Sequence, residues 1–225
     1  MGSEKQDPHS GMEDPLRQEA PGAREKPRPE GARLFIAVPL SDVQIAGLTD
    51  LMDRLKKGAQ FTQCRPTWVA PETIHLTLAF LGKRPAEEVP VLAQCLHLAA
   101  AGFGPLKLEI KGLGVFPDWR GPRVMWAGLR ERTHQLDPLR ERLIAKLRSL
   151  RVAYDDKPFK PHLTLARFKS LSGTAAFGKV AGAHEGFFMP AQTLDRLVLF
   201  SSELNPAGAR HTPLHTESLS GGGDE

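Results

Sequence analysis

The sequence predicts an α+β fold with two similar lobes. Short apolar runs alternate with segments whose apolar residues recur at helical spacing, so strands and helices are both expected. Some neighbouring strands are separated only by turn residues, which favours hairpins over a doubly wound parallel sheet. The word HLTLA occurs twice, at 75–79 and 162–166, which indicates an internal duplication. Each lobe would then carry an antiparallel sheet with its helices, and a cleft would separate the lobes.

The first part of the folded chain is predicted as strand, helix and strand. The apolar run from Arg33 to Leu40 is expected to be a strand, and Ser41 can cap the helix that follows. The apolar residues of that helix recur at helical spacing and are Val43, Leu48, Leu51, Met52 and Leu55. A turn at Pro71 and Glu72 precedes the first HLTLA strand, which we expect to end at Gly82.

The remaining elements continue the same alternation. We expect a helix from Ala86 to Ala101, and then two strands, LKLEIKGLGVF and PRVMWAGL, that are joined by the turn-rich PDWRG. Thr133 is the expected cap of the next helix, THQLDPLRERLIAKLRSL, which leads to the second HLTLA strand. The segments LDRLVLFSSEL and RHTPLHTESL are predicted to form a closing strand pair.

Composition limits the class of protein. The 225 residues are 40% hydrophobic and 25% charged, which is typical of a globular chain. No run of eighteen apolar residues is present, and the N-terminus lacks the basic and then apolar order of a signal peptide, so we expect a cytoplasmic protein without membrane contact. A monomer is expected, although no sequence pattern specifies the oligomeric state. Cys64 and Cys95 belong to no closely spaced motif, and we expect both to be reduced and structural.

The two ends of the chain differ from its centre. Residues 1–32 contain five prolines, four glycines and few large apolar side chains, so a disordered tail is predicted there. Residues 220–225 are predicted to be a flexible C-terminus, which leaves 33–219 as the folded domain. The tail contains five basic and seven acidic residues against a net charge of +4 for the chain, so the rest carries +6. This charge is compatible with a polyanionic or phosphorylated partner.

The repeated word places two kinds of polar side chain on one face of each strand. Residues two apart in a strand share a face, so His75 and Thr77 point one way while Leu76 points the other. The same holds for His162 and Thr164 in the second copy. A single His-x-Thr is most often structural, but two copies facing each other across a cleft would gather two imidazoles and two hydroxyls.

That set of groups suits in-line displacement at a phosphate diester. One neutral histidine can remove a proton from the attacking oxygen, while the other, protonated, gives a proton to the leaving oxygen. Hydroxyl groups can hold the charged phosphate oxygens. The sequence contains no GxSxG, GxxxxGK[ST], HExxH or GxGxxG motif, and neither HLTLA copy brings a carboxylate or thiolate to complete a metal site. We therefore expect neither a metal nor another cofactor.

The blocks around the two words resemble a known family. The doubled His-x-Thr is similar to the signature of the 2H phosphoesterase superfamily. In order, RLFIAVPL, WVAPETIHLTLAFLG, GVFPDWRGPRVMWAGL and KPFKPHLTLARF resemble the bacterial and archaeal RNA 2′,3′-cyclic phosphodiesterases, historically called 2′-5′ RNA ligases. The resemblance runs from about Arg33 to about Leu219, nearly the whole folded body.

The resemblance implies a bilobal fold with pseudo-two-fold symmetry, no metal requirement, and RNA with a 2′,3′-cyclic phosphate end as substrate. The implied reaction is hydrolysis to a 2′-phosphate, with reversible 2′-5′ joining of RNA ends under some conditions. By motif position, His75 would donate a proton to the leaving 3′ oxygen and His162 would accept one from water. Thr77 and Thr164 would bind the phosphate.

Other residues are candidates for positioning the substrate. Arg167 follows the second HLTLA, where the first copy has Phe80, and it could hold phosphate or brace the lobe. Arg123 and Trp126 lie in the strand RGPRVMWAGL, and Phe116 precedes it. Phe116 or Trp126 could stack on a terminal base, although aromatics at strand spacing more often belong to the core. The remaining histidines outside the tail have no repeated context and are taken as structural or surface residues: His97, His134, His184, His211 and His215.

Two alternatives remain open. The same chemistry could act on another small cyclic phosphate, such as one from nucleotide-sugar metabolism, or on a 2′-5′ linked oligonucleotide. A protein that binds nucleotide or RNA without turnover could also retain the fold, although such a binder need not retain both imidazoles.

Overall fold

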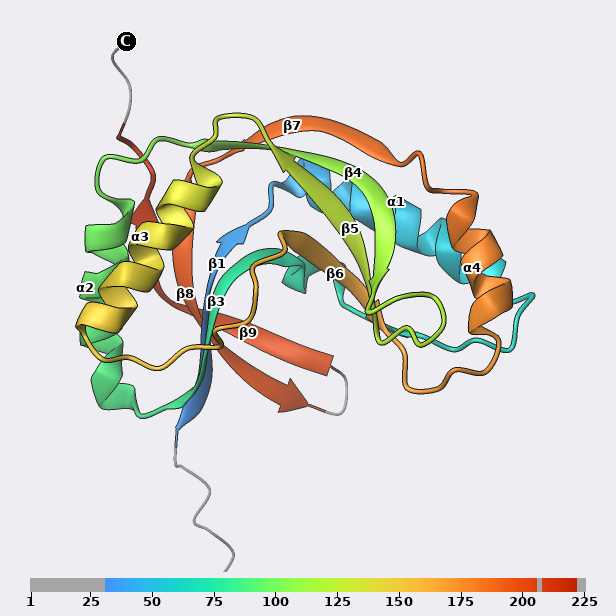
Figure 1. The fold of residues 1–225 in the computed structure, drawn as a ribbon, viewed down its shortest axis with the longest axis horizontal. Coiled ribbons are helices and arrows are strands. Elements are labelled where there is room, and N and C mark those ends of the chain that lie inside the picture. The colour runs from blue at the N-terminus through green and yellow to red at the C-terminus, as the bar shows by residue number, and fades with distance from the viewer. Residues whose placement is uncertain (1–30, 206–207, 222–225) are drawn as a thin grey trace, which may run out of the picture.

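The structure, a computed structural model, describes residues 31–205 and 208–221 and is an α+β protein with two antiparallel sheets (Figure 1). One sheet has four strands in the order β3-β1-β8-β9, and the other has five in the order β2-β6-β5-β4-β7. The predicted fold class with two lobes is therefore confirmed. In chain order the elements are β1 (Ala32–Pro39), α1 (Asp42–Ala59), β2 (Thr67–Trp68), η1 (Pro71–Thr73), β3 (His75–Arg84), η2 (Ala86–Glu88), α2 (Val89–Ala100), β4 (Leu106–Phe116), β5 (Val124–Glu131), α3 (Leu136–Ser149), β6 (His162–Arg167), α4 (Thr174–Gly182), β7 (Phe188–Leu194), β8 (Arg196–Asn205) and β9 (Gly208–Ser218).

The duplication is visible in the topology. Each HLTLA strand pairs with the strand that opens its own repeat, β3 with β1 and β6 with β5. A long helix joins the two strands in each case, α1 in the first repeat and α3 in the second. Helices α2 and α3 pack together on one side of the molecule, while α1 and α4 pack together on the other (Figure 1). The two copies therefore occupy equivalent positions, one in each sheet.

Both HLTLA strands carry a β-bulge at the same residue of the word. In β3 the register against β1 skips Leu78, and in β6 the register against β5 skips Leu165. A bulge reverses the side-chain alternation beyond it. As a result, Phe80 is directly opposite Phe35 and Arg167 is directly opposite Val124, on the faces that carry the motif histidines.

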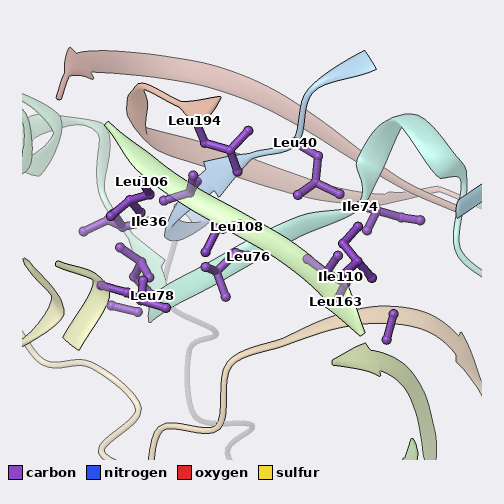
Figure 2. Packing of buried hydrophobic residues seen from close by; sticks show 14 of the residues in the cluster. Ile36, Leu40, Ile74, Leu76, Leu78, Leu106, Leu108, Ile110, Leu163 and Leu194 are labelled. Atoms are coloured by element: carbon purple, nitrogen blue, oxygen red, sulfur yellow. The ribbon is translucent and has the colours of Figure 1, made fainter. Parts of the chain in front are cut away.

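The leucines of the two words enter a common hydrophobic core. Leu76 and Leu163 have no exposed surface, and Figure 2 shows Leu76 near Leu108 and Leu163 near Ile110, both residues of β4. Helix α1 is tied to β4 in this core by Gln44, whose buried side-chain amide donates to the Leu108 carbonyl at 3.0 Å. The apolar face of each HLTLA strand thus holds the strand in place, while its polar face stays available for a site.

The expected element boundaries are confirmed in part. Ser41 caps α1 in a capping box with Gln44, as predicted. Thr133 is not the cap of α3: the N-cap is Gln135, because the Thr133 hydroxyl donates to the Glu131 carboxylate instead. Gly82 does not end the first HLTLA strand, because pairing with β1 continues to Arg84. The left-handed φ of 72° at Gly82 falls where the register against β1 shifts, between Leu34 and Phe35.

Three short elements, β2, α4 and β7, were not predicted from the sequence. The two-residue β2 pairs with β6, and β7 pairs with β4, so both depend on neighbours distant in the chain. No helix among residues 31–205 and 208–221 is long and apolar enough to cross a membrane.

The predicted tail and flexible C-terminus fall mostly outside the described residues. Residues 1–30 are not described, and Ala32 already belongs to β1. At the other end, the Gly221 amide donates to the Phe103 carbonyl at 2.8 Å, so backbone hydrogen bonding to the rest of the domain reaches residue 221.

Candidate active site

The two motif histidines are held in the same way. Each opens its strand, and the Nδ1 atom of each lies against the backbone carbonyl two residues earlier: His75 at 2.7 Å from Thr73 O and His162 at 2.6 Å from Lys160 O. A carbonyl oxygen can only accept, so both Nδ1 atoms carry the proton in these hydrogen bonds. In each imidazole Nε2 is then the nitrogen that can exchange a proton with a substrate.

The strands that carry these histidines approach each other although they belong to different sheets. The imidazoles are close enough for a charge on His162 to contribute to lowering the pKa of His75. The two motif histidines therefore lie near each other, because β3 and β6 approach each other from the two sheets.

An aromatic cluster encloses His75. Its ring stacks on buried Phe35 with the centroids 4.6 Å apart and the planes 24° apart, and His211 meets it edge-on at 5.3 Å. Phe200 stacks on the same Phe35 at 5.2 Å. Burial lowers the pKa of His75 to about 4, with smaller lowering by His211 and His162, while the bond to the Thr73 carbonyl acts in the opposite direction. His75 is therefore neutral at pH 7 before substrate binds.

His162 has a different aromatic neighbour. The ring of Phe116 meets it edge-on, with centroids 5.0 Å apart and planes at 90°. Phe116 also packs at 5.2 Å against Trp126, whose indole lies so close over Gly114 that a Cβ there would be 2.2 Å from it. The Lys160 ammonium lies 5.8 Å from the Phe116 centroid. The candidate Phe116 thus lies beside the second motif histidine and packs on the Trp126 indole, which has room there because residue 114 is glycine.

The two threonines follow the histidines on the same faces. Thr77 is opposite Ala37 of β1, and Thr164 is opposite Trp126 of β5. Both are half-buried, and neither hydroxyl forms a hydrogen bond with another described residue. A hydroxyl without a protein partner on the motif face is free to donate to a bound anion.

The structure places the two candidate arginines at one end of β6. Arg167 is exposed and, because of the bulge at Leu165, lies on the face of His162 and Thr164. Arg123 is joined to the same strand end by its carbonyl, which accepts from the Phe168 amide at 3.0 Å. Neither guanidinium forms an ion pair with another described residue. Arg167 can therefore reach an anion on the motif face.

A cavity of about 330 Å³ opens directly beside His75. Its walls come from the end of β1, the turn η1, and strands β8 and β9, and they comprise Pro39, Glu72, Thr73, Ile74, His75, Phe200, Ala209, Arg210 and His211. The sequence pattern did not identify Phe35, Phe200 or His211 as members of the site. The only available signal was that β9 was expected to pair with β8, which does not reveal where the hairpin lies relative to β3.

The structure shows side-chain contacts for three of the other histidines, His97, His211 and His215. His211 lies against the ring of His75. His97 and His215 both contact the Glu217 carboxylate, at 3.3 and 2.6 Å, in agreement with a structural role. Among residues 31–205 and 208–221, no three His, Cys, Asp or Glu side chains form a group that could hold a metal ion.

Comparison with known proteins identifies the family. The family model described as LigT like Phosphoesterase matches residues 38–126 and 129–211. An RNA 2′,3′-cyclic phosphodiesterase of Thermus thermophilus is 34% identical over 194 residues, which cover 84% of this chain and 91% of that protein. One of Geobacillus stearothermophilus is 35% identical over 133 residues, and that match covers 59% of this chain but only 41% of the relative.

A solved structure shows the same fold. The crystal structure of TT0787 of Thermus thermophilus superposes with a TM-score of 0.68 at 32% identity, over 84% of this chain and 98% of that one. The matched family segments include both HLTLA words. The chain therefore belongs to the LigT-like phosphoesterase family.

Proposed function

We propose that this protein hydrolyses the terminal 2′,3′-cyclic phosphate of RNA to a 2′-phosphate, with His75 and His162 as its acid and base. The observation that carries the proposal is the identical anchoring of the two imidazoles, which reserves Nε2 of each for proton exchange. Relatives that match most of this chain are named RNA 2′,3′-cyclic phosphodiesterases, which supports the same substrate class here. The net charge of +4 agrees with a polyanionic substrate.

In the proposed reaction, Nε2 of His162 takes a proton from water as the water oxygen attacks phosphorus. The bond between phosphorus and O3′ breaks on the opposite side, and protonated His75 gives its Nε2 proton to O3′. The products are a 2′-phosphate and a free 3′-hydroxyl. The proton gained by His162 goes to solvent and His75 regains one from solvent, which restores both imidazoles. Thr77 and Thr164 donate to the non-bridging oxygens, where charge builds up in the transition state.

Ligation follows from the same arrangement. If the 5′-hydroxyl of a second RNA takes the place of the attacking water on the His162 side, its attack on the cyclic phosphate forms a 2′-5′ linkage and releases O3′. The reverse reaction uses the two imidazoles with their roles exchanged. Because two imidazoles supply all the proton transfers, the proposed chemistry needs no bound cation.

The test uses an RNA that ends in a 2′,3′-cyclic phosphate, incubated with purified protein in EDTA. We expect a 2′-phosphate end as the product, at an unchanged rate when EDTA is omitted. A 3′-phosphate product would show that O2′, and not O3′, is the leaving oxygen. Loss of activity in EDTA would mean that a metal-bound hydroxide, and not water activated by His162, is the nucleophile. If the RNA is bound but never cleaved, the protein is a binding module and not an enzyme.

A further inference from the structure

The cavity beside His75 takes no part in the proposed proton transfers. His75 forms one wall of this space of about 330 Å³, so a group in the cavity would lie next to the proton that His75 donates. Small-molecule sites usually begin at about 300 Å³. The cavity is therefore large enough for part of a substrate.

In-line geometry determines which part of the substrate is on this side. The attacking water and the leaving O3′ lie on opposite sides of phosphorus, so the acid and the base flank the phosphate from opposite directions. O3′ belongs to the terminal ribose, and the nucleoside therefore extends from the side of the residue that protonates O3′. With His75 as that residue, which rests on the proposed function, the terminal nucleoside extends toward the cavity.

The lining of the cavity fits a nucleobase. Pro39, Ile74 and Phe200 supply apolar surface, and Phe200 is held with one face stacked on Phe35. His211 supplies a polar ring within this surface, and an aromatic platform with a few polar groups is the usual setting for an unpaired base. Arg210 and Glu72 are exposed at the cavity, where the chain of an RNA can reach them.

His211 has hydrogen-bonding capacity that the protein does not use. Burial lowers its pKa, an effect that the nearby Arg210 carbonyl partly offsets, so the ring is neutral at pH 7. Its Nδ1 is buried, so a ligand cannot reach that atom, whereas Nε2 makes no hydrogen bond to a described residue. In a neutral imidazole Nε2 donates or accepts according to the tautomer, so it can form one hydrogen bond with the edge of a base.

We propose that this cavity is the subsite for the nucleobase of the terminal nucleotide, with His211 as its hydrogen-bonding residue and Phe200 as its stacking surface. His211 then determines which 3′-terminal nucleotides the enzyme processes efficiently. The same position packs the ring against His75, so the base contact and the proton donor belong to one aromatic cluster.

The proposal is tested by comparing two substrates in three proteins. The substrates are a nucleoside 2′,3′-cyclic monophosphate and the 2′,3′-cyclic phosphate of 1-O-methylribose, which has no base. The proteins are the wild type, His211→Leu and the matched control His215→Leu, which changes a histidine on the same strand outside the cavity. We expect the ratio of kcat/KM for the nucleotide over the sugar to fall about tenfold in His211→Leu, the value of one lost hydrogen bond, through KM. His215→Leu should keep the wild-type ratio.

Binding gives a second readout that does not depend on turnover. Calorimetry should give the dissociation constants of a nucleoside 2′-monophosphate and of inorganic phosphate. We expect His211→Leu to weaken binding of the nucleotide about tenfold more than binding of phosphate. Equal losses on both substrates and both ligands would show that His211 acts only by supporting His75, which overturns the inference. If wild-type protein binds the nucleotide as predicted but hydrolyses neither substrate, the proposed function fails and the subsite stands. If it hydrolyses both without preference for the base, the function stands and the subsite fails.

Discussion

The proton-donor role of His75 makes a demanding prediction about its pKa. Before substrate binds, burial holds this pKa at about 4, so at pH 7 only about one molecule in a thousand has the ring protonated. A general acid works best with a pKa near the working pH. Binding of substrate must therefore raise the pKa by about 3 units, which corresponds to about 4 kcal/mol.

One phosphate charge is enough to supply this energy. A cyclic phosphodiester carries a single negative charge, and two unit charges about 4 Å apart interact by about 4 kcal/mol at the effective dielectric of a partly buried site. The lowering by His162 and His211 is smaller than that by burial, and a bound anion offsets it. We therefore expect the pKa of His75 to rise from about 4 in the free protein to about 7 in the complex.

The assay is a nuclear magnetic resonance titration of the imidazole signals. The protein, labelled at histidine, is titrated from pH 3.5 to 9 alone and with saturating nucleoside 2′-monophosphate, and His75→Gln assigns the signal. This ligand carries one to two negative charges over that range, so the rise in the pKa of His75 should be at least as large as that worked out for one charge. If the pKa of His75 stays below 5 in the complex while turnover peaks near pH 7, His75 cannot be the proton donor. The roles of His75 and His162 would then have to be exchanged, and the nucleoside would lie on the His162 side.

Four further predictions can be checked independently. His75→Ala and His162→Ala should each lower kcat by roughly 10²- to 10⁴-fold in steady-state assays, and the double variant should lose less than the product of the two, because both groups act on one transition state; near-normal activity of either single variant contradicts the mechanism. Stability should depend on pH through His75: its folded pKa of about 4 lies below the unfolded value of about 6.5, so its contribution is complete above pH 6.5 and is lost as pH falls toward 4. In urea unfolding, the free energy of unfolding should fall between pH 7 and pH 4 by about 3 kcal/mol more in the wild type than in His75→Gln. Equal falls in the two proteins would place His75 in a solvated environment. Leu163→Ala, at a position without exposed surface, should lower the free energy of unfolding by about 2–5 kcal/mol in the same experiment, and a change below 1 kcal/mol would contradict its place in the core. A chain that begins at Gly31 should keep its melting temperature and its turnover, because residues 1–30 contain few apolar side chains, and a large fall in either would show that this segment contributes to the fold.

The sequence alone determined the features that depend on local periodicity. Alternation within HLTLA placed each histidine with its threonine on one face and the leucines on the other, and the structure bears this out for Leu76 and Leu163. Local signals also placed the Ser41 cap and the hairpin of β8 and β9. The repetition of the word was enough to propose a paired site, because duplicated strands take equivalent places in duplicated lobes.

Only the tertiary structure decided which distant side chains meet the motif. Strict alternation would put Arg167 on the face opposite Thr164, and the bulge at Leu165 places both on the same face. His211 is 136 residues from His75 in the chain. It meets that ring because the sheet order β3-β1-β8-β9 and the pairing registers of its strands place the two residues on the same face at the same level. The burial that lowers the pKa of His75 comes from those same strands. Periodicity is a property of neighbours in the chain, whereas bulges, register and burial depend on pairing between strands, which no local pattern specifies.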